Sequence, residues 1–373
     1  MRKSIIGAAV LFFMLQMPVK ALDLSAECAY LMTADSSICL YEKNGNQRHG
    51  MASTTKIMTA VTVIENSNPE DTAIVSANAA AQEGSSVYLK IGDRVSADAL
   101  LYGMLLNSGN DAACAAAELV GGSVDNFADM MNGKAKEIGA EDTSFRNPSG
   151  LDEDGHYSTA HDMALIASYA MRNEKFREIV SSKQSKITTG NAVCYLKNHN
   201  KLLWNYDGCI GVKTGFTKKT GRCLVSCAER NGVELIAVTL GAPDDWNDHK
   251  KMLDYGFEET ERIVVTEKGA VMKDYSDEYG GLRAVAAESA AYSDKKGGKS
   301  HCDIILHTVD SPNGVIHEGE KIGFAEYRIL NKTVKEIDLL ADRTVEIHTV
   351  KKPFGGGIIE RLKNTVCRLM GID

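Results

Sequence analysis

The sequence predicts a mixed α/β (α+β) fold, in which helices flank an antiparallel sheet and a small all-β domain follows. Three observations predict this class. An alternating pattern with a tight turn at Ser36-Ser37 leads into the apolar segment 51–65, as expected for a hairpin followed by a buried helix. Consecutive strand patterns then occupy 209–240. Short alternating runs separated by turn residues occupy 259–350.

The chain begins with a segment that is typical of a secretory signal. Residues 1–21 combine a positive start, an apolar run from Ile5 to Met17 and a small-residue exit at Ala21. The apolar run is too short for a comfortable membrane span. We therefore expect an exported protein that works outside the cytoplasm.

Charge and length limit the possible functions. The signal segment holds three basic residues and no acidic one, so its removal changes the net charge from −8 to −11. An acidic chain argues against nucleic acid as a partner. The remaining length of about 350 residues exceeds one ordinary core and predicts two domains.

The nine cysteines are an odd number, so an exported chain leaves at least one thiol unpaired or pairs it with another chain. Cys223 and Cys227 are four residues apart, and no cluster of His and Cys has the spacing of zinc ligands. We interpret most of the cysteines as small buried apolar residues. We expect neither a metal nor a cofactor.

Ser53 and Lys56 form the first candidate site, in a segment without Gly or Pro. Residues three apart share a helix face, so the Lys56 amine can lie beside the Ser53 hydroxyl. A serine hydroxyl needs a base, and a lysine held neutral by burial and neighbouring cations can serve. A first-turn position also favours a developing oxyanion. The pattern S-x-x-K also arises by chance, as at Ser293–Lys296, in a polar stretch that we expect to be solvated.

Ser108 and Asn110 form the second candidate site. They lie between the expected helices 97–106 and 111–120, where a loop can project a hydroxyl and an amide into a cleft. The alternative is ordinary capping, because Ser, Gly and Asn are favoured at helix junctions. Upstream, Gly84–Gly92 is expected to be extended.

Lys213, Thr214 and Gly215 form the third candidate site. They lie on the first of three expected strands, before 222–228 and 233–240. A cation and a hydroxyl on a strand, with Gly allowing close backbone approach, suit an anionic, extended substrate. The alternative is an edge-strand lysine that keeps the sheet soluble.

The three motifs S-x-x-K, S-x-N and K-T-G, in this order, resemble those of the penicillin-recognising serine enzymes. The closer likeness is to the low-molecular-mass penicillin-binding proteins that act as D-alanyl-D-alanine carboxypeptidases. The supporting stretches are 52–59, 105–112, 147–152, 155–160, 211–217 and 253–257. The likeness covers residues 24–258 and continues more loosely toward residue 350. It implies a penicillin-binding/β-lactamase-like transpeptidase fold.

The resemblance also implies a role for each motif residue. Ser53 would attack the carbonyl between two terminal D-alanines and form an acyl-enzyme, and Lys56 would take its proton. Ser108 would pass a proton to the leaving D-alanine, and Asn110 would hold the substrate or Lys56. Lys213 would supply positive potential at Ser108 and at the substrate carboxylate, and Thr214 would hydrogen-bond that carboxylate. The backbone N–H groups of Ser53 and Phe216 would form the oxyanion hole. β-Lactams would act as inhibitors.

Two further features belong to this likeness. In some members an arginine follows the strand after K-T-G and helps to bind the substrate carboxylate. This chain has no obvious counterpart of that arginine in Gly241–Asp245. The loop 147–159 is expected to border the cleft, with Ser158 as the N-cap of the helix 160–171 and His156 as a structural residue rather than a base.

The expected domains are the signal peptide 1–21, the catalytic domain 22–258, the β-rich domain 259–350 and the tail 351–373. Apolar and basic residues of the tail fall on opposite sides of a short helix. Such a helix can lie in an anionic membrane surface, and the alternative is packing on its own β domain. The resemblance supports the membrane, with the protein at the outer face of the cytoplasmic membrane.

The leading interpretation is therefore a D-Ala-D-Ala carboxypeptidase that trims the pentapeptide stems of peptidoglycan. A DD-endopeptidase that cleaves cross-links uses the same residues and stays open. A class A serine β-lactamase would carry an E-x-x-x-N segment between Ser108 and Lys213, and the chain has none there. A non-catalytic cell-wall-binding protein is disfavoured because all the reactive side chains are present.

Overall fold

The computed structural model describes residues 22–275, 279–309, 312 and 314–347. The chain divides into two compact units. Of the described residues, the first unit holds 22–262 together with Ser293–Gly298, and the second holds those in 263–292 and 299–347. The expected signal segment and the expected tail helix lie outside the described residues.

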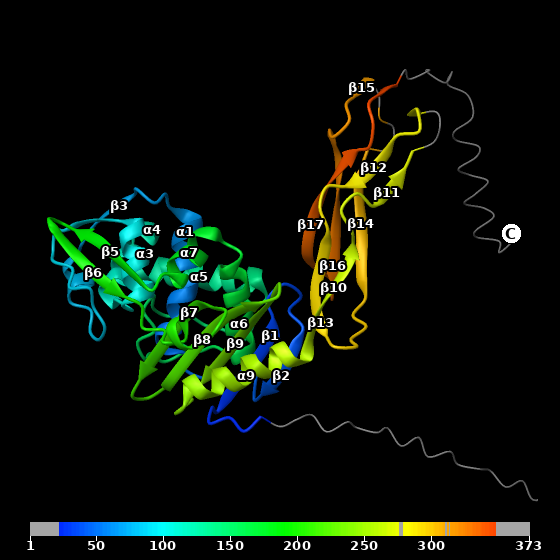
Figure 1. Cartoon of the computed structure of the whole chain (residues 1–373). Coiled ribbons are helices and arrows are strands. Elements are labelled where there is room, and N and C mark those ends of the chain that lie inside the picture. Colours follow the sequence, from blue (N-terminus) through cyan, green and yellow to red (C-terminus); the bar gives the residue numbers. More distant parts are fainter. Residues whose placement is uncertain (1–21, 276–278, 310–311, 313, 348–373) are drawn as a thin grey trace, which may run out of the picture. The chain divides into compact units, whose positions relative to one another are not determined.

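The first unit is built on a five-stranded antiparallel sheet in the order β2-β1-β9-β8-β7 (Figure 1). Its strands are β1 (Cys28–Thr33), β2 (Cys39–Lys43), β7 (Cys209–Thr217), β8 (Gly221–Arg230) and β9 (Val233–Leu240). The last three follow one another in the chain, as the sequence predicted. The strand that carries K-T-G, β7, is an edge of this sheet.

Helices cover both faces of the sheet, which explains why β8 and β9 are almost continuously buried. Along β1, Tyr30 and Met32 pack into the larger core, whereas Ala29 and Leu31 pack toward Met252 of α9 (Asp245–Glu259). This alternation is the period of a strand. The remaining longer helices of the unit are α1 (Lys56–Asn66), α3 (Ala97–Leu106), α4 (Asn110–Gly121), α5 (Val124–Ile138), α6 (Ala160–Met171) and α7 (Glu174–Ser181).

Short elements complete the first unit. The hairpins β3 (Thr72–Ile74) with β4 (Arg94–Ser96) and β5 (Gln184–Thr189) with β6 (Ala192–Lys197) stand apart from the main sheet. Two single-turn helices are α2 (Ala77–Ala80) and α8 (Leu202–Asn205), and η1 (Ala52–Thr55) is a 3₁₀ helix.

Side-chain caps explain where several helices begin. The Ser96 hydroxyl accepts the N–H of Ala99 at the start of α3. At the start of α6 the cap is Thr159, whose hydroxyl accepts the N–H of Asp162. The prediction of Ser158 as this cap was wrong by one residue, because the Ser158 hydroxyl lies 2.8 Å from Thr143 Oγ1 instead.

The segment Gly84–Gly92, which was expected to be extended, joins no strand. The buried carboxylate of Asp111 accepts hydrogen bonds from backbone N–H groups of this segment, which a strand would use to pair with a neighbour. The carboxylate accepts the N–H groups of Val87 and Leu89 at 3.1 and 3.0 Å and the hydroxyl of Ser86 at 2.6 Å. The segment is therefore a loop fixed to the first turn of α4.

The second unit is all-β, as predicted. Its main sheet has the order β11-β12-β17-β16-β14, from β11 (Val271–Asp274), β12 (Arg283–Ala286), β14 (Cys302–Thr308), β16 (Lys321–Ile329) and β17 (Lys332–Ala341). The small pair is β15 (Gly314–Ile316) and β18 (Val345–Ile347). Strands β10 (Thr260–Thr266) and β13 (Ala290–Lys295) pair with each other, and both cross the boundary between the units. Tyr327 and Leu339 lie in the core.

The eight described cysteines carry free thiols, and Cys367 lies outside the described residues. Four of the eight are buried and four are half-buried, so the interpretation as small buried residues holds for half of them. Within the described ranges, no group of three or more His, Cys, Asp or Glu side chains is placed to hold a metal ion. No described helix has the length and apolar character needed to cross a membrane.

Candidate active site

Ser53 lies in the 3₁₀ turn η1, directly before α1. The sequence predicted one helix from residue 51, whereas the structure begins it as a tighter 3₁₀ turn. The Thr54 hydroxyl donates to the carbonyl of Met51 at 2.6 Å, which fixes the start of the turn. Ala52 has a φ of 46°, a left-handed conformation that non-glycine residues rarely adopt. Such strain is often stored beside reactive groups.

The side chain of Lys56 is fully buried beneath Ser53. Its Nζ atom lies 2.9 Å from Ser53 Oγ, 2.7 Å from Asn110 Oδ1 and 2.6 Å from the carbonyl oxygen of Ser149. Burial, and then the charge of Lys213, hold the pKa of Lys56 well below its usual range.

These contacts fit a neutral amine. A neutral lysine has two N–H donors, and two carbonyl-type oxygens stand ready to accept them, from Asn110 and Ser149. The nitrogen lone pair is then left for the third neighbour, the hydroxyl of Ser53. This arrangement can draw the proton from the serine.

Ser108 and Asn110 occupy the junction between α3 and α4, and both are nearly buried. Ser108 has a φ of 62°, a second left-handed residue at the site. Asn110 is the first residue of α4, and its Nδ2 donates to the carbonyl of Glu83 at 2.5 Å. Both ends of the Asn110 amide therefore have partners, so its orientation is fixed.

Lys213 extends from β7 into the same cluster and is almost fully buried. Its Nζ donates to Ser108 Oγ at 3.1 Å and to the carbonyl of Thr214 at 2.9 Å. Burial lowers its pKa to about 7, so this ammonium titrates near neutral pH. Lys213 thus contacts Ser108, and its charge helps to lower the pKa of Lys56.

Gly215 lets β7 pass close to the nucleophile. A Cβ atom at this position would lie 3.0 Å from the backbone N of Ser53 and 3.1 Å from that of Thr54. Real Cβ contacts this short are rare, so a side chain here would push the strand away from η1.

A cleft joins these groups to solvent. Its lining residues are Ser53, Ser85, Ser108, His199, Lys201, Thr214, Gly215, Phe216, Arg222, Asp245 and Trp246. Of the eight residues predicted from the motifs, five line the cleft, and Lys56, Asn110 and Lys213 lie buried. The structure brings all eight together.

Arg222 is one of the cleft residues that the sequence argument missed. It lies on β8 directly opposite Phe216, so its side chain shares a face of the sheet with those of Phe216 and Thr214. Its Nε lies 3.1 Å from the buried carboxylate of Asp245. The register of the hairpin β7–β8 was the signal that could have found it. The resemblance instead places the expected arginine after the next strand, in Gly241–Asp245, where the chain has none.

His156 is held by both ring nitrogens. Its Nδ1 accepts the backbone N–H of Arg146 at 3.0 Å, so Nε2 carries the proton and donates to Thr55 Oγ1 at 2.9 Å. Burial lowers the pKa of His156 to about 4. A neutral, doubly bonded imidazole is structural, as expected.

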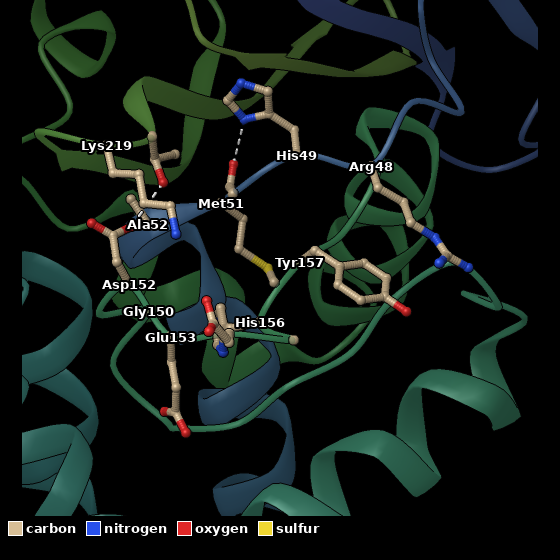
Figure 2. A pocket seen from close by; sticks show the side chains of 14 residues that line it. Arg48, His49, Met51, Ala52, Gly150, Asp152, Glu153, His156, Tyr157 and Lys219 are labelled. Carbon is tan, nitrogen blue, oxygen red and sulfur yellow. Dashed lines mark hydrogen bonds between the residues drawn. The ribbon is translucent and has the colours of Figure 1, made fainter.

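His156 also borders a second pocket, of about 320 Å³ (Figure 2). The pocket is lined by the segment 48–52, which directly precedes Ser53, by Gly150 and the loop 152–157, and by Lys219 and Thr220. Asp152 in this loop accepts the hydroxyls of Thr217 and Thr220, at 2.9 and 3.0 Å. The loop is therefore tied to the turn between β7 and β8.

The second S-x-x-K match does not form a comparable site. Ser293 is fully buried on β13, rather than solvated as expected, and its hydroxyl lies 3.1 Å from the carboxylate of Asp35. An amine is the partner of Ser53, whereas an acidic group is the partner of Ser293.

Residues 15–244 match the family Peptidase_S11, D-alanyl-D-alanine carboxypeptidase. The chain is 38% identical over 245 residues to the D-alanyl-D-alanine carboxypeptidase DacF of Bacillus subtilis, covering 63% of this chain and 63% of that protein. It is 30% identical over 366 residues to DacC of Escherichia coli, covering 91% and 90%.

The fold agrees with a solved relative, penicillin binding protein 5 from Haemophilus influenzae. That structure is 28% identical, has a TM-score of 0.64 and covers 87% of this chain and 99% of its own. The match confirms the predicted penicillin-binding-protein fold with its C-terminal β-rich domain. The chain belongs to the D-alanyl-D-alanine carboxypeptidases of the serine peptidase family Peptidase_S11.

Proposed function

We propose that this protein removes the terminal D-alanine from peptidoglycan pentapeptide stems through an acyl-enzyme on Ser53. The observation that carries the proposal is the set of contacts at Lys56. Its Nζ atom lies within hydrogen-bond distance of the Asn110 and Ser149 oxygens and of Ser53 Oγ. In the neutral amine the two carbonyl-type oxygens accept the N–H groups, which leaves the lone pair for the Ser53 hydroxyl. A buried neutral amine in this geometry is a general base.

Acylation follows from this arrangement. Ser53 Oγ attacks the carbonyl carbon of the penultimate D-alanine while Lys56 takes the hydroxyl proton. The backbone N–H groups of Ser53 and Phe216 stabilise the oxyanion, and the proximity of Gly215 to η1 supports this pair. The C–N bond then breaks, and the proton that Lys56 took passes through the Ser108 hydroxyl to the leaving nitrogen, which leaves Lys56 neutral again. Lys213 holds the Ser108 hydroxyl in place by donating to it.

Deacylation uses the same groups in reverse. Lys56 takes a proton from water as the water oxygen attacks the ester carbonyl, and it returns that proton to Ser53 Oγ as the Ser53–acyl bond breaks. The products are a stem shortened by one residue and free Ser53. Of the two roles considered for Asn110, the contact with Lys56 supports orientation of the base.

The carboxylate of the leaving D-alanine needs hydrogen-bond donors and cationic partners. Thr214 and Lys213 were expected from the motif, and Arg222 adds a guanidinium on the same face as Thr214. A planar guanidinium is well suited to a carboxylate. Asp245 holds Arg222 in the cleft through their ion pair.

The cellular setting rests on segments outside the described residues. The signal pattern of 1–21 supports export, and the basic amphipathic pattern of 351–373 supports attachment to the outer face of the cytoplasmic membrane. Covalent inhibition by β-lactams follows from the acyl-enzyme chemistry. A β-lactamase is disfavoured because the chain lacks the deacylating glutamate segment.

Intact-mass analysis tests the proposal. The protein is mixed with penicillin and, separately, with a peptide ending in D-Ala-D-Ala. We expect a stable adduct on Ser53 and release of free D-alanine. Ser53→Ala should lose the adduct while its thermal unfolding stays nearly unchanged. Labelling that survives this substitution would overturn the site assignment, and rapid penicillin hydrolysis without an adduct would indicate a β-lactamase.

A further inference from the structure

Strand β14 (Cys302–Thr308) is an edge of the main sheet in the second unit. Among the described residues it is hydrogen-bonded to β16 and to no other strand, so the backbone groups along its outer side have no strand partner. The side chains of Lys273 and Tyr275 contact the C-terminal end of the strand and the residue after it. These contacts leave 303–307 open, where four of the five side chains are exposed.

The edge lacks the usual protection against pairing with another chain. Proteins commonly protect an exposed edge with a proline, a lysine or a β-bulge. The sequence of β14, Cys-Asp-Ile-Ile-Leu-His-Thr, has neither proline nor lysine. Its register with β16 is regular from Cys302 to Thr308, without a bulge. The strand therefore presents a continuous edge to which a further strand can be added.

The apolar side chains of β14 also lack a cover. Ile304 and Leu306 lie opposite Tyr327 and Ala325 of β16, which belong to the core of the second unit. Residues opposite each other share a face of the sheet, so Ile304 and Leu306 point to the core side. They are nevertheless 42% and 37% exposed. The core thus extends to an open edge, where one more strand would bury both side chains.

The sequence of β14 is complementary to itself. Antiparallel pairing of two copies about a twofold axis at Ile305 places Asp303 of each copy opposite His307 of the other. The same register places Ile304 opposite Leu306. One face of the new strand pair then carries two carboxylate–imidazole pairs, and the other face carries four apolar side chains. No other antiparallel register places Asp303 opposite His307.

The two charged residues are available for this pairing. His307 Nε2 lies 3.2 Å from the carboxylate of Glu326, and the ring stacks on Phe324 with 4.3 Å between ring centres. These contacts hold the ring on the polar face and leave Nδ1 for a second carboxylate. Asp303 pairs with His301, but both side chains are more than half exposed. An exposed pair of this kind contributes little, so it can be exchanged for a contact with a second copy.

We propose that a second copy of this chain docks on β14, by antiparallel pairing of the two β14 strands about a twofold axis at Ile305. The two five-stranded sheets would then form one continuous sheet. The contact is isologous, so it closes at a dimer and does not propagate into a fibre. A single strand pair is a small interface, and the dimer is therefore weak and reversible. The inference does not rest on the proposed function.

Sedimentation velocity over a range of concentrations tests the dimer, with the full chain in mild detergent. We expect a reversible monomer–dimer equilibrium. Leu306→Lys should raise the dimer dissociation constant by about tenfold or more, because a charge enters the apolar face of the strand pair. Asp303→Lys, on the polar face away from the core, should weaken the dimer by placing a cation opposite His307. Val315→Lys is the matched control, because Val315 is 53% exposed on β15, outside the main sheet.

Disulfide cross-linking tests the register. Residues directly opposite in antiparallel strands have Cβ atoms about 4.5–5.5 Å apart, close enough for a disulfide after small adjustments. Ile305→Cys, oxidised with copper phenanthroline, should give a covalent dimer on a non-reducing gel. The wild type and Val315→Cys should not. The inference is overturned if the chain is monomeric at every concentration, if the dimer survives both lysine substitutions at β14, or if Val315→Cys cross-links as well as Ile305→Cys.

Discussion

The Asn110 amide oxygen lies 2.7 Å from the Lys56 amine, and the amide nitrogen of the same side chain donates to the carbonyl of Glu83. Asn110 therefore orients the base Lys56. Asn110 is itself held by Glu83, which lies in the loop just before the cleft residue Ser85. A neutral oxygen at this distance accepts an N–H without adding charge. It therefore does not oppose burial and the charge of Lys213, which hold the pKa of Lys56 well below its usual range.

Asn110→Asp tests that relationship. A carboxylate at 2.7 Å would stabilise the protonated form of Lys56 and raise its pKa. We expect acylation by penicillin at neutral pH to fall by about 100-fold and to recover as the pH rises. Stopped-flow acylation across a pH series measures this change. Asn126→Asp, at an exposed position on α5, provides the control. Equal losses at all pH values would contradict a role through Lys56.

The pH profile of kcat/KM should report Lys213. Burial lowers its pKa to about 7, and the free enzyme needs this ammonium to attract the substrate carboxylate. Activity should therefore fall as the pH rises above about 7. Lys213→Arg should move this descending limb to higher pH, because a guanidinium stays protonated. An unmoved limb in a folded variant would assign the titration to another group.

Arg222→Gln tests carboxylate recognition. Loss of the guanidinium should raise KM for a D-Ala-D-Ala peptide by about tenfold or more, equivalent to at least about 1.4 kcal/mol of binding. Penicillin acylation should slow as well, since penicillin also carries a carboxylate. Arg230→Gln is the matched control, because Arg230 lies on the same strand but pairs with Asp254 outside the cleft. Equal kinetics for the two variants would remove Arg222 from the site.

His156 should make the folded state sensitive to acid. Its pKa is about 4 in the folded protein against 6.5 in the unfolded chain, so the neutral form favours folding. This contribution, on the order of 3 kcal/mol, is complete above pH 6.5 and is lost as the pH falls toward 4. His249, with a pKa of about 3, adds a loss in the same direction.

His156→Gln should be less stable than the wild type at pH 7.5, but should lose less further stability between pH 6.5 and 4. Urea unfolding at several pH values measures this difference. His301→Gln, at a side chain that is 85% exposed, should follow the wild type. Folded His156→Gln should still form the penicillin adduct. Loss of the adduct without loss of structure would show that His156 takes part in the chemistry.

The sequence was informative where local patterns determine structure. Helices α3 and α6 match their predicted bounds, because apolar periodicity and end signals coincide there. The three motifs were also sufficient to identify the family. Their residues are separated by more than 150 positions, yet each lies on an element whose type could be predicted.

Contacts that depend on tertiary structure could not be predicted in this way. The Ser149 carbonyl is a backbone atom with no sequence signature, although it is one of the three partners of Lys56. Arg222 enters the cleft through strand register, and Asp111 turns an expected extended segment into a loop. Each is fixed by residues distant in the chain, so a local pattern does not reveal it.

Because Gly215 has no side chain, β7 lies so close to η1 that a Cβ atom at position 215 would crowd the backbone of η1. In the proposed reaction, every carbonyl that Ser53 attacks has to enter the space between β7 and η1, whether it belongs to a peptide or to a β-lactam. Drug resistance achieved by a side chain at position 215 would therefore carry its own penalty. The steric change that excludes the antibiotic would also exclude the stem peptide, so the two activities cannot be separated at this position.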